Sequence, residues 1–376
     1  MYSGNQVKNQ ILASNLVNYS CRLKPGERIW IEAVGTEGLS LVDDIVKEVY
    51  KAGGVPFVNI VHEKIQRSWL NGATEEQIKF LAKYDVLKME EMQAYIRVSA
   101  MSNQAELSDV PDDKRAMYQL FYNKPVNTDV RVPKTKWVVL TYPSAGSAQQ
   151  AGKSSEAYEE FFYNVCNMDY KKMGEAMDKL VNVMRKTDKV TIKGPGCDFS
   201  FSIKDIPVIK CDGINNIPDG EVFTAPVKNS VNGYVTFNAP SNFQGYTFEN
   251  IKLEFKDGKI INASANDTER INKILNTDDG ARYVGEFAIG VNPYITQPAK
   301  NTLFDEKIAG SFHFTPGSCY DEAPNGNKSA IHWDMVCIQT PEYGGGEMYF
   351  DGELVRQNGI FVHPELVVLN PENLIG

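Results

Sequence analysis

The chain has 376 residues, of which 42% are hydrophobic and 23% are charged, and its formal net charge is −9. The apolar fraction excludes a disordered chain, and the composition excludes collagen-like, coiled-coil and disulfide-scaffold proteins. The basic residues form no clustered stripe, so we expect no nucleic-acid partner. No stretch approaches the roughly 18 apolar residues of a membrane span, and the first residues do not read as a secretory signal, so we expect no membrane partner.

Cysteine and histidine usage narrows the chemistry further. The six cysteines form no Cys-x-x-Cys pair, which argues against a thiolate zinc site and is typical of reduced thiols in a cytoplasmic protein. Any imidazole chemistry must use some of the four histidines, which are His62, His313, His332 and His363. His62 and His363 have no evident partner in the sequence, so we interpret them as structural.

The first half of the chain alternates apolar strands with helices. Strands are predicted at 27–34, 56–61, 94–99 and 136–141, and helices at 6–18, 41–50, 75–92, 113–122, 155–166 and 170–185. Strands that alternate with helices imply crossover connections and a mostly parallel sheet. We therefore expect an α/β N-terminal domain over residues 1–185.

Short β-rich runs dominate after residue 186. The pairs Asp257-Gly258 and Asp351-Gly352 lie between runs of alternating apolar residues, which is a strong hairpin signal. A helix is expected at 266–275. We therefore expect a β-rich α+β C-terminal domain over residues 186–376, and the candidate metal ligands place the catalytic site in this domain.

Two glutamates lie in predicted strands of this second half. Glu221 follows a turn and begins a β-like run, and Glu286 lies inside the apolar run 284–290. On a strand, Glu286 would share its face with Val284 and Ala288. A carboxylate in such surroundings is costly to bury unless it is paired or bound to a cation. This pattern makes Glu286 a candidate metal ligand.

Two histidines of the second half also lie in apolar surroundings. His313 alternates with Phe312 and Phe314, which places its side chain on the polar face of a strand. His332 and Asp334 are spaced i and i+2, so we expect them on one face of a strand, about 6–7 Å apart. Imidazole and carboxylate groups without thiolates suit zinc, cobalt or manganese in a catalytic site.

Several motifs together resemble one family of enzymes. They are 218–226 (PDGEVFTAP), 285–290 (GEFAIG), 301–306 (NTLFDE), His313, Tyr320 and 332–334 (HWD), with 142–143 (YP) and 155–161 (SEAYEEF) in the first half. Their order and approximate spacing resemble the aminopeptidase T / aminopeptidase S family of two-metal metallopeptidases over most of the chain. The resemblance implies a cytoplasmic homodimer that removes the first residue from peptides with a free N-terminus.

The resemblance also implies roles for individual residues. Tyr320 would be the catalytic tyrosine, and Glu306 would be either a further ligand or the general base. Glu286 and Asp334 are candidates to bridge two ions. The full set of implied metal ligands is Glu221, Glu286, Glu306, His313, His332 and Asp334.

The resulting hypothesis is a metal-dependent aminopeptidase. Two divalent ions, zinc or cobalt with manganese as a further option, would share a bridging water and activate it for attack on the scissile carbonyl. Tyr320 would donate to the developing oxyanion, and Glu306 would carry the proton to the leaving amine.

Two alternative functions stay open on the sequence alone. A related metallo-amidase or dipeptidase would use the same ligands in a different pocket. A non-catalytic α/β protein that holds a small ligand would bind no metal and hydrolyse nothing.

Overall fold

A computed structural model describes residues 4–375 of the chain. They form two compact units, of which the first takes in the chain up to Asn167 together with Gly213–Ile217. The second unit consists of Met168–Asp212 and the chain from Pro218 onward. The domain division near residue 186 stays a prediction. All six cysteines are free thiols, and no helix in the described part of the chain has the length and apolar character needed to cross a membrane.

The first unit contains a parallel sheet with the strand order β2-β1-β3-β4-β8. All of its pairings are parallel, as the alternation of strands and helices predicted. The five strands are β1 (Arg28–Val34), β2 (Val55–Val61), β3 (Ala94–Ser99), β4 (Lys136–Thr141) and β8 (Asn216–Ile217).

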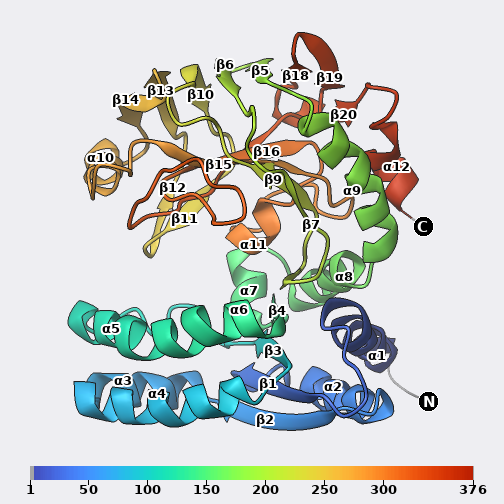
Figure 1. Ribbon diagram of the computed structural model, residues 1–376, viewed down its shortest axis with the longest axis vertical. Coiled ribbons are helices and arrows are strands. Elements are labelled where there is room, and N and C mark those ends of the chain that lie inside the picture. Colours follow the sequence, from blue (N-terminus) through green and yellow to red (C-terminus); the bar gives the residue numbers. More distant parts are fainter. Residues whose placement is uncertain (1–3, 376) are drawn as a thin grey trace. The chain divides into compact units, whose positions relative to one another are not determined.

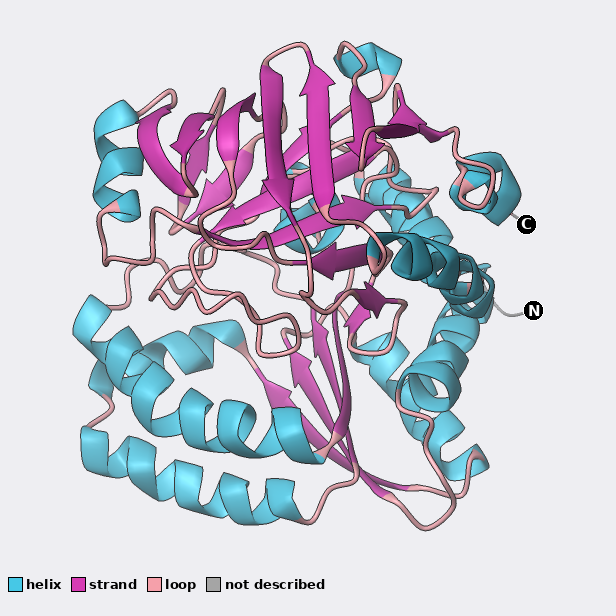
Figure 2. Cartoon of the chain, turned by 45° about the horizontal axis from the view of Figure 1, so that its top comes forward, coloured by secondary structure: helices cyan, strands magenta, loops and turns pink. Residues whose placement is uncertain are grey.

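Helices cover both faces of this parallel sheet. Figure 1 shows α3, α4 and α5 on one side of the strands and α1 and α2 on the other, and Figure 2 shows the same helical layers from a second direction. The helical segments of this unit are α1 (Gly4–Ser14), η1 (Asn15–Ser20), α2 (Leu39–Lys51), α3 (Glu63–Gly72), α4 (Glu75–Glu90), α5 (Asp112–Tyr118), η2 (Gln119–Arg131), α6 (Val132–Lys134), α7 (Ala145–Gln150) and α8 (Ser155–Cys166).

The second unit is built mainly from antiparallel strands. Its larger sheet has eight strands, in spatial order β14 (Lys259–Ser264), β13 (Lys252–Lys256), β10 (Asn232–Thr236), β6 (Cys197–Ser202), β5 (Lys189–Gly194), β18 (Glu347–Phe350), β19 (Glu353–Gln357) and β20 (Ile360–Phe361). Both predicted hairpins are confirmed, because β13 pairs with β14 around Asp257-Gly258 and β18 pairs with β19 around Asp351-Gly352.

A second sheet of this unit has five strands. They are, in spatial order, β17 (Met335–Ile338), β16 (Ser311–Pro316), β15 (Val284–Gly290), β9 (Glu221–Thr224) and β7 (Ile209–Cys211). A short hairpin of β11 (Ser241–Phe243) and β12 (Tyr246–Phe248) lies apart from both sheets. The helical segments are α9 (Tyr170–Met184), α10 (Thr268–Leu275), α11 (Thr302–Asp305), η3 (Pro341–Tyr343), η4 (Val367–Leu369) and α12 (Pro371–Leu374). The predicted fold class is confirmed in both halves of the chain.

An aromatic core joins the two large sheets of the second unit. The ring of Phe201, on β6, lies 4.9 Å from Phe287 on β15 and 5.1 Å from Phe314 on β16. Phe199 lies 5.3 Å from Phe314 in an edge-to-face arrangement. Each ring removed from water in this way stabilises the fold by about 1.5–3 kcal/mol. Because side chains alternate along a strand, the neighbours of Phe287 and Phe314 point to the opposite face of the five-stranded sheet.

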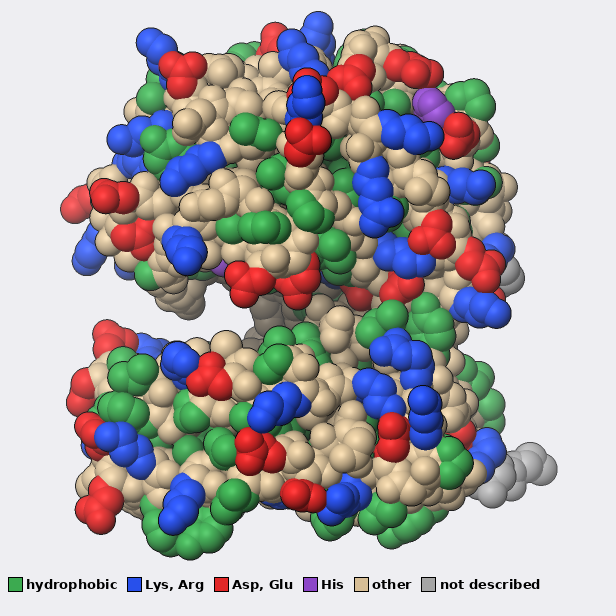
Figure 3. Space-filling view, in the orientation of Figure 1, with side chains coloured by type: hydrophobic (Ala, Val, Ile, Leu, Met, Phe, Trp, Pro, Cys, Tyr) green, Lys and Arg blue, Asp and Glu red, His purple; other side chains and the backbone are tan. Residues whose placement is uncertain are grey.

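Charged side chains of both signs are mixed on the surface. Figure 3 shows Lys and Arg interspersed with Asp and Glu over the visible face of the molecule. The two histidines that were interpreted as structural make local contacts. The Nδ1 atom of His62 accepts from the backbone N–H of Lys64 at 3.3 Å and caps α3, and His363 Nδ1 accepts from the N–H of Glu365 at 3.2 Å.

Candidate metal centre

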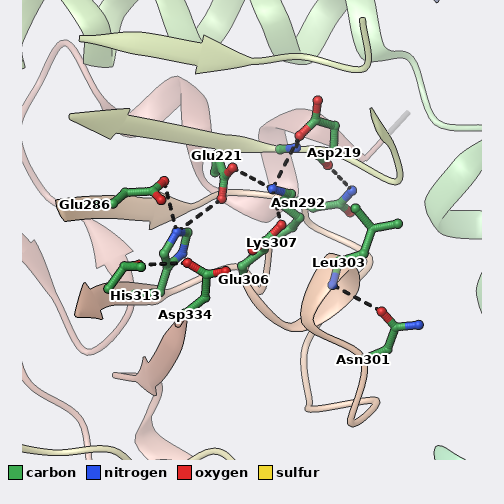
Figure 4. Close-up of polar contacts among 12 residues, drawn as sticks. Asp219, Glu221, Glu286, Asn292, Asn301, Leu303, Glu306, Lys307, His313 and Asp334 are labelled. Atoms are coloured by element: carbon green, nitrogen blue, oxygen red, sulfur yellow. Dashed lines mark hydrogen bonds and ion pairs between the residues drawn. The ribbon is translucent and has the colours of Figure 1, made fainter. Parts of the chain in front are cut away.

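Three neighbouring strands of the five-stranded sheet carry the first half of the candidate centre. In the strand register, Glu221 lies opposite Gly290, and His313 lies opposite Ala288. Glu286 is two residues from Ala288 along the same strand, so all three polar side chains share one face. Gly290 and Ala288 fill almost none of the space between them. The polar groups therefore point toward one another, as Figure 4 shows.

The ring of His313 is the centre of this group. Its Nε2 atom lies 3.4 Å from Glu286 Oε1 and 3.6 Å from Glu221 Oε2. All three side chains are buried. The alternation of Phe312, His313 and Phe314 therefore predicted the strand and its polar face correctly. Glu221 and Glu286 are likewise brought to the position that their patterns suggested.

The assignment of His332 and Asp334 to a strand is wrong. The strand β17 begins only at Met335, and His332 makes a single isolated bridge to Gly317. The next pairing would require an N–H from Pro316, which proline lacks, so the ladder with β16 ends there. The two side chains still meet, because His332 Nε2 lies 3.3 Å from Asp334 Oδ1.

His332 and Asp334 also reach the strand residues. His332 Nε2 lies 3.2 Å from Glu286 Oε2, and the hydroxyl of Thr315 donates to Asp334 Oδ1 at 2.7 Å. The Nδ1–H of His332 donates to the backbone oxygen of Ser318 at 2.8 Å. When the ring is neutral this bond keeps its proton on Nδ1 and leaves Nε2 toward the carboxylates as the metal-binding atom, which is the usual arrangement of a metal-binding histidine.

Glu306 and Tyr320 lie beside this cluster. Glu306 follows the short helix α11, and one of its oxygens lies within 4.8 Å of ligand atoms of His313 and Asp334. The ring of Tyr320 lies 4.6 Å from the ring of His332, and the side chain is 45% exposed. Burial, followed by the charge of Glu286, raises the pKa of Tyr320, so its hydroxyl stays a hydrogen-bond donor. The structure therefore brings all seven predicted site residues together.

The sequence interpretation missed Lys307 and Asp219. The Lys307 side chain is only 1% exposed, and its ammonium lies 2.5 Å from Glu221 Oε1, 2.7 Å from Glu306 Oε1 and 3.6 Å from Asp219 Oδ1. Figure 4 shows this ammonium between Glu221 and Asp219. A lysine next to an acidic pair usually reads as a solvated surface charge. Only the long-range contact with Glu221 reveals its burial.

The buried charges of this cluster do not balance. Five carboxylates (Asp219, Glu221, Glu286, Glu306 and Asp334) face one ammonium and two imidazoles, so five negative charges would meet at most three positive ones. The pKa values of the side chains respond to this surplus. Burial raises the pKa of Glu221 to about 8 despite the Lys307 ammonium. Burial lowers the pKa of each imidazole, but the carboxylates outweigh it and raise His313 to about 10 and His332 to about 11.

Unsatisfied polar atoms indicate what the cluster lacks. Glu221 Oε2 and His332 Nε2 are buried and have no hydrogen-bond partner among the described residues. A buried polar atom without a partner is costly, and a cation bound between these groups would satisfy both atoms. Oxygen and imidazole donors fit a divalent transition-metal ion. Two of the possible ligand sets among the described residues, Glu221-Glu286-His313 and Glu286-His332-Asp334, share one glutamate.

Comparisons with known proteins agree with this chemistry. The chain is 26% identical to aminopeptidase AmpS of Bacillus subtilis, over 85% of this chain and 86% of that protein. It is 24% identical to aminopeptidase PepS of Streptococcus thermophilus, over 90% and 92%. The solved structure of wild-type AmpT from Thermus thermophilus has the same fold, with a TM-score of 0.77 and 22% identity over 95% of this chain and 99% of that one. Because the model of the thermophilic metalloprotease (M29) family matches residues 6–361, this chain belongs to that family and is a peptide hydrolase.

Proposed function

We propose that this protein is an aminopeptidase that uses two divalent metal ions to release the N-terminal residue of peptides. The observation that carries the dinuclear centre is the placement of Glu286. Its Oε1 faces His313 at 3.4 Å, and its Oε2 faces His332 at 3.2 Å. A carboxylate whose two oxygens face different imidazoles is arranged to bridge two ions.

The remaining ligands divide around Glu286. Glu221 and His313 would complete one ion's ligands, and His332 and Asp334 would complete those of the other. Glu306 lies near His313 and Asp334, so it would act as a further ligand or as the general base. The donor set contains no thiolate, which supports zinc, cobalt or manganese.

Bound divalent ions would polarise the scissile carbonyl and activate a shared water. The chain's own residues would then handle the oxyanion and the proton. Tyr320 stays protonated beside His332, so its hydroxyl would donate to the oxygen on which negative charge develops. Glu306, if not fully committed to metal, would accept the proton of the water and pass it to the leaving amine.

Two divalent ions and the Lys307 ammonium would together balance the five carboxylates, so the substrate's free α-amine would be held by a metal ion or by one acidic group rather than by surplus charge. An acylated N-terminus could not bind in either way. The named activities of the relatives support this specificity. The free cysteines support a cytoplasmic location, and the resemblance to the aminopeptidase T / aminopeptidase S family supports a homodimer.

The test measures metal content and activity together. Elemental analysis of the purified chain should find two divalent ions per chain, and chelation should abolish the release of amino acids from aminoacyl amides. His332→Ala should lose metal and activity, while the control His363→Ala, in which the lost imidazole lies near Glu353 outside the centre, should keep both.

Full activity and metal content in His332→Ala would contradict the site. Equal rates on aminoacyl amides and their N-acetylated forms would contradict the exopeptidase specificity. A substrate panel that includes dipeptides and simple amides separates the aminopeptidase from a dipeptidase or an amidase.

A further inference from the structure

A second polar cluster lies on the parallel sheet of the first unit. Glu32 on β1 is the register partner of Arg97 on β3, and Trp30 is the partner of Tyr95. A parallel sheet covered by helices on both faces normally carries apolar side chains there. A glutamate and an arginine at the centre of such a face reduce stability unless they are well paired. Their presence there therefore suggests a role other than stabilising the fold.

A cavity of about 780 Å³, partly open to solvent, lies over this polar face. The sheet residues Trp30, Glu32 and Arg97 form its floor, and Trp69, Tyr118 and Tyr122, from α3, α5 and η2, form part of its wall. All of its lining residues belong to the first unit. The volume is that of a small-molecule site, and aromatic walls with a few convergent polar groups are typical of such sites.

Polar atoms at this cavity lack partners within the protein. The Trp30 side chain is 1% exposed, and its Nε1–H has no acceptor among the described residues. The Nε–H of Arg97 has none either, because its nearest carboxylate oxygen, Glu32 Oε2, lies 3.7 Å away. Yet 41% of the Arg97 side-chain surface is accessible, since the guanidinium faces the cavity. The accessible part of this guanidinium can therefore pair with an anion that enters the cavity.

The cavity also offers negative groups. Glu32 accepts a hydrogen bond from the Tyr95 hydroxyl at 2.7 Å, and Asp85 accepts one from Tyr122 at 2.8 Å. Both carboxylates line the cavity. The rings of Tyr118 and Tyr122 stack at 4.8 Å and add a flat apolar wall. The cavity therefore presents the guanidinium groups of Arg97 and Arg115, two carboxylates and an aromatic surface to one partly open volume.

We propose that this cavity binds a small zwitterion with an apolar or aromatic group, the class of free amino acids and short peptides. The Arg97 guanidinium pairs with the ligand carboxylate, because its planar donors match a carboxylate. Glu32 or Asp85 receives the ligand ammonium, and the aromatic rings enclose the side chain. This inference does not rest on the proposed function, because all of these residues lie outside the metal centre.

Calorimetric titration of the full chain with L-phenylalanine tests the proposal. The protein is metal-free and carries His332→Ala, so that the metal centre does not contribute. We expect one site per chain. Phenylpropanoate, which lacks the ammonium, and phenethylamine, which lacks the carboxylate, should each bind at least about tenfold more weakly.

Arg97→Gln should weaken L-phenylalanine binding at least about tenfold. The control is Arg28→Gln on the same strand, where the guanidinium pairs with Glu91 at 3.0 Å on the surface. That variant should bind as the parent does. The fluorescence of Trp30 and Trp69 should change on binding, since both rings line the cavity.

Three results would overturn the proposal: no binding of L-phenylalanine or L-leucine at millimolar concentration, equal binding of either analogue, or equal binding by a folded Arg97→Gln variant. If thermal unfolding shows that Arg97→Gln does not fold, the analogue series on the protein with the intact cavity decides.

Discussion

The two units of the molecule each bury a polar cluster on a sheet face, but the clusters differ in charge and in space. In the second unit, five carboxylates crowd around Lys307, His313 and His332 with little room between them. In the first unit, Glu32 and Arg97 lie loosely at 3.7 Å beside an open volume of about 780 Å³. A compact cluster with surplus negative charge suits small cations. An open cluster with both signs suits a molecule that carries both signs.

This difference shows how the surroundings of a charge select its partner. Both clusters lie where a sheet face would ordinarily be apolar, so both reduce the stability that the fold could have. The cluster of the second unit needs only positive charge, which small cations supply. The cluster of the first unit needs a larger partner that carries charges of both signs and fills the cavity. Four experiments test this contrast.

Glu286→Gln should have the largest effect. The amide keeps the shape of the side chain but removes the charge that both ligand sets share. Activity on aminoacyl amides should therefore fall by more than about 100-fold, and metal content should drop. Glu353→Gln is the control, because that carboxylate is 68% exposed near His363. Unchanged metal content in Glu286→Gln would show that charge surplus is not what distinguishes the two clusters.

Lys307→Met should destabilise the metal-free protein by about 3–5 kcal/mol, because it leaves Glu221 and Glu306 without their buried ammonium. Urea unfolding of the variant and the parent measures the difference. Lys204→Met, at an exposed position, should change the free energy of unfolding by less than about 0.5 kcal/mol. Equal stabilities of the Lys307 variant and the parent would mean that the ammonium does not compensate the cluster.

Tyr320→Phe should lower kcat about 100-fold, or about 2.7 kcal/mol, while metal content stays at the parent level. The proposal gives the Tyr320 hydroxyl a role in the reaction and none in metal binding. Tyr349→Phe removes a hydroxyl that bonds to Glu347 at 2.7 Å away from the centre, and it should leave kcat unchanged. Loss of metal from Tyr320→Phe would instead assign the residue to the metal ligands.

The coupling between Glu32 and Arg97 should be the smallest effect. A double-mutant cycle of Glu32→Gln and Arg97→Gln should give less than about 1 kcal/mol, because the two groups lie 3.7 Å apart and Arg97 is 41% accessible. Denaturant unfolding without ligand measures it. A coupling of several kcal/mol would mean that the pair is a closed structural ion pair rather than an open binding site.

The sequence predicted those parts of the fold whose pattern is local. Alternation around His313 and the Asp-Gly hairpins depend on neighbouring residues only, and both are confirmed. Helix α3 was not predicted. Its N-cap is His62, and a histidine is not one of the residues that usually signal the start of a helix. The strand at His332 was wrongly predicted because Pro316, which ends the ladder, lies on a different strand.

Local patterns pointed to Glu286, His313, His332 and Asp334, and the family motifs were needed for the rest of the predicted site. The resemblance supplied Glu306 and Tyr320, whose local patterns carry no signal of metal or catalysis. Lys307 and Asp219 lie far apart in the sequence, and the ammonium is identified as buried only once Glu221 is placed beside it. The cavity at Arg97 could not be predicted from the sequence, because an arginine in an apolar strand is usually interpreted as a solvent-exposed charge at the edge of a sheet.

Gly290 has a consequence for how the centre moves. A Cβ atom at this position would lie 2.4 Å from the backbone oxygen of Ile308, so the loop backbone rests directly against the strand. The N–H of Asn292 donates to the oxygen of Lys307 at 3.0 Å and ties the loop a second time. The loop that presents Glu306 therefore cannot open while the sheet stays closed. The amide hydrogens of this loop should therefore exchange as slowly as those of the sheet, and not at the fast rate of a surface turn that frays locally.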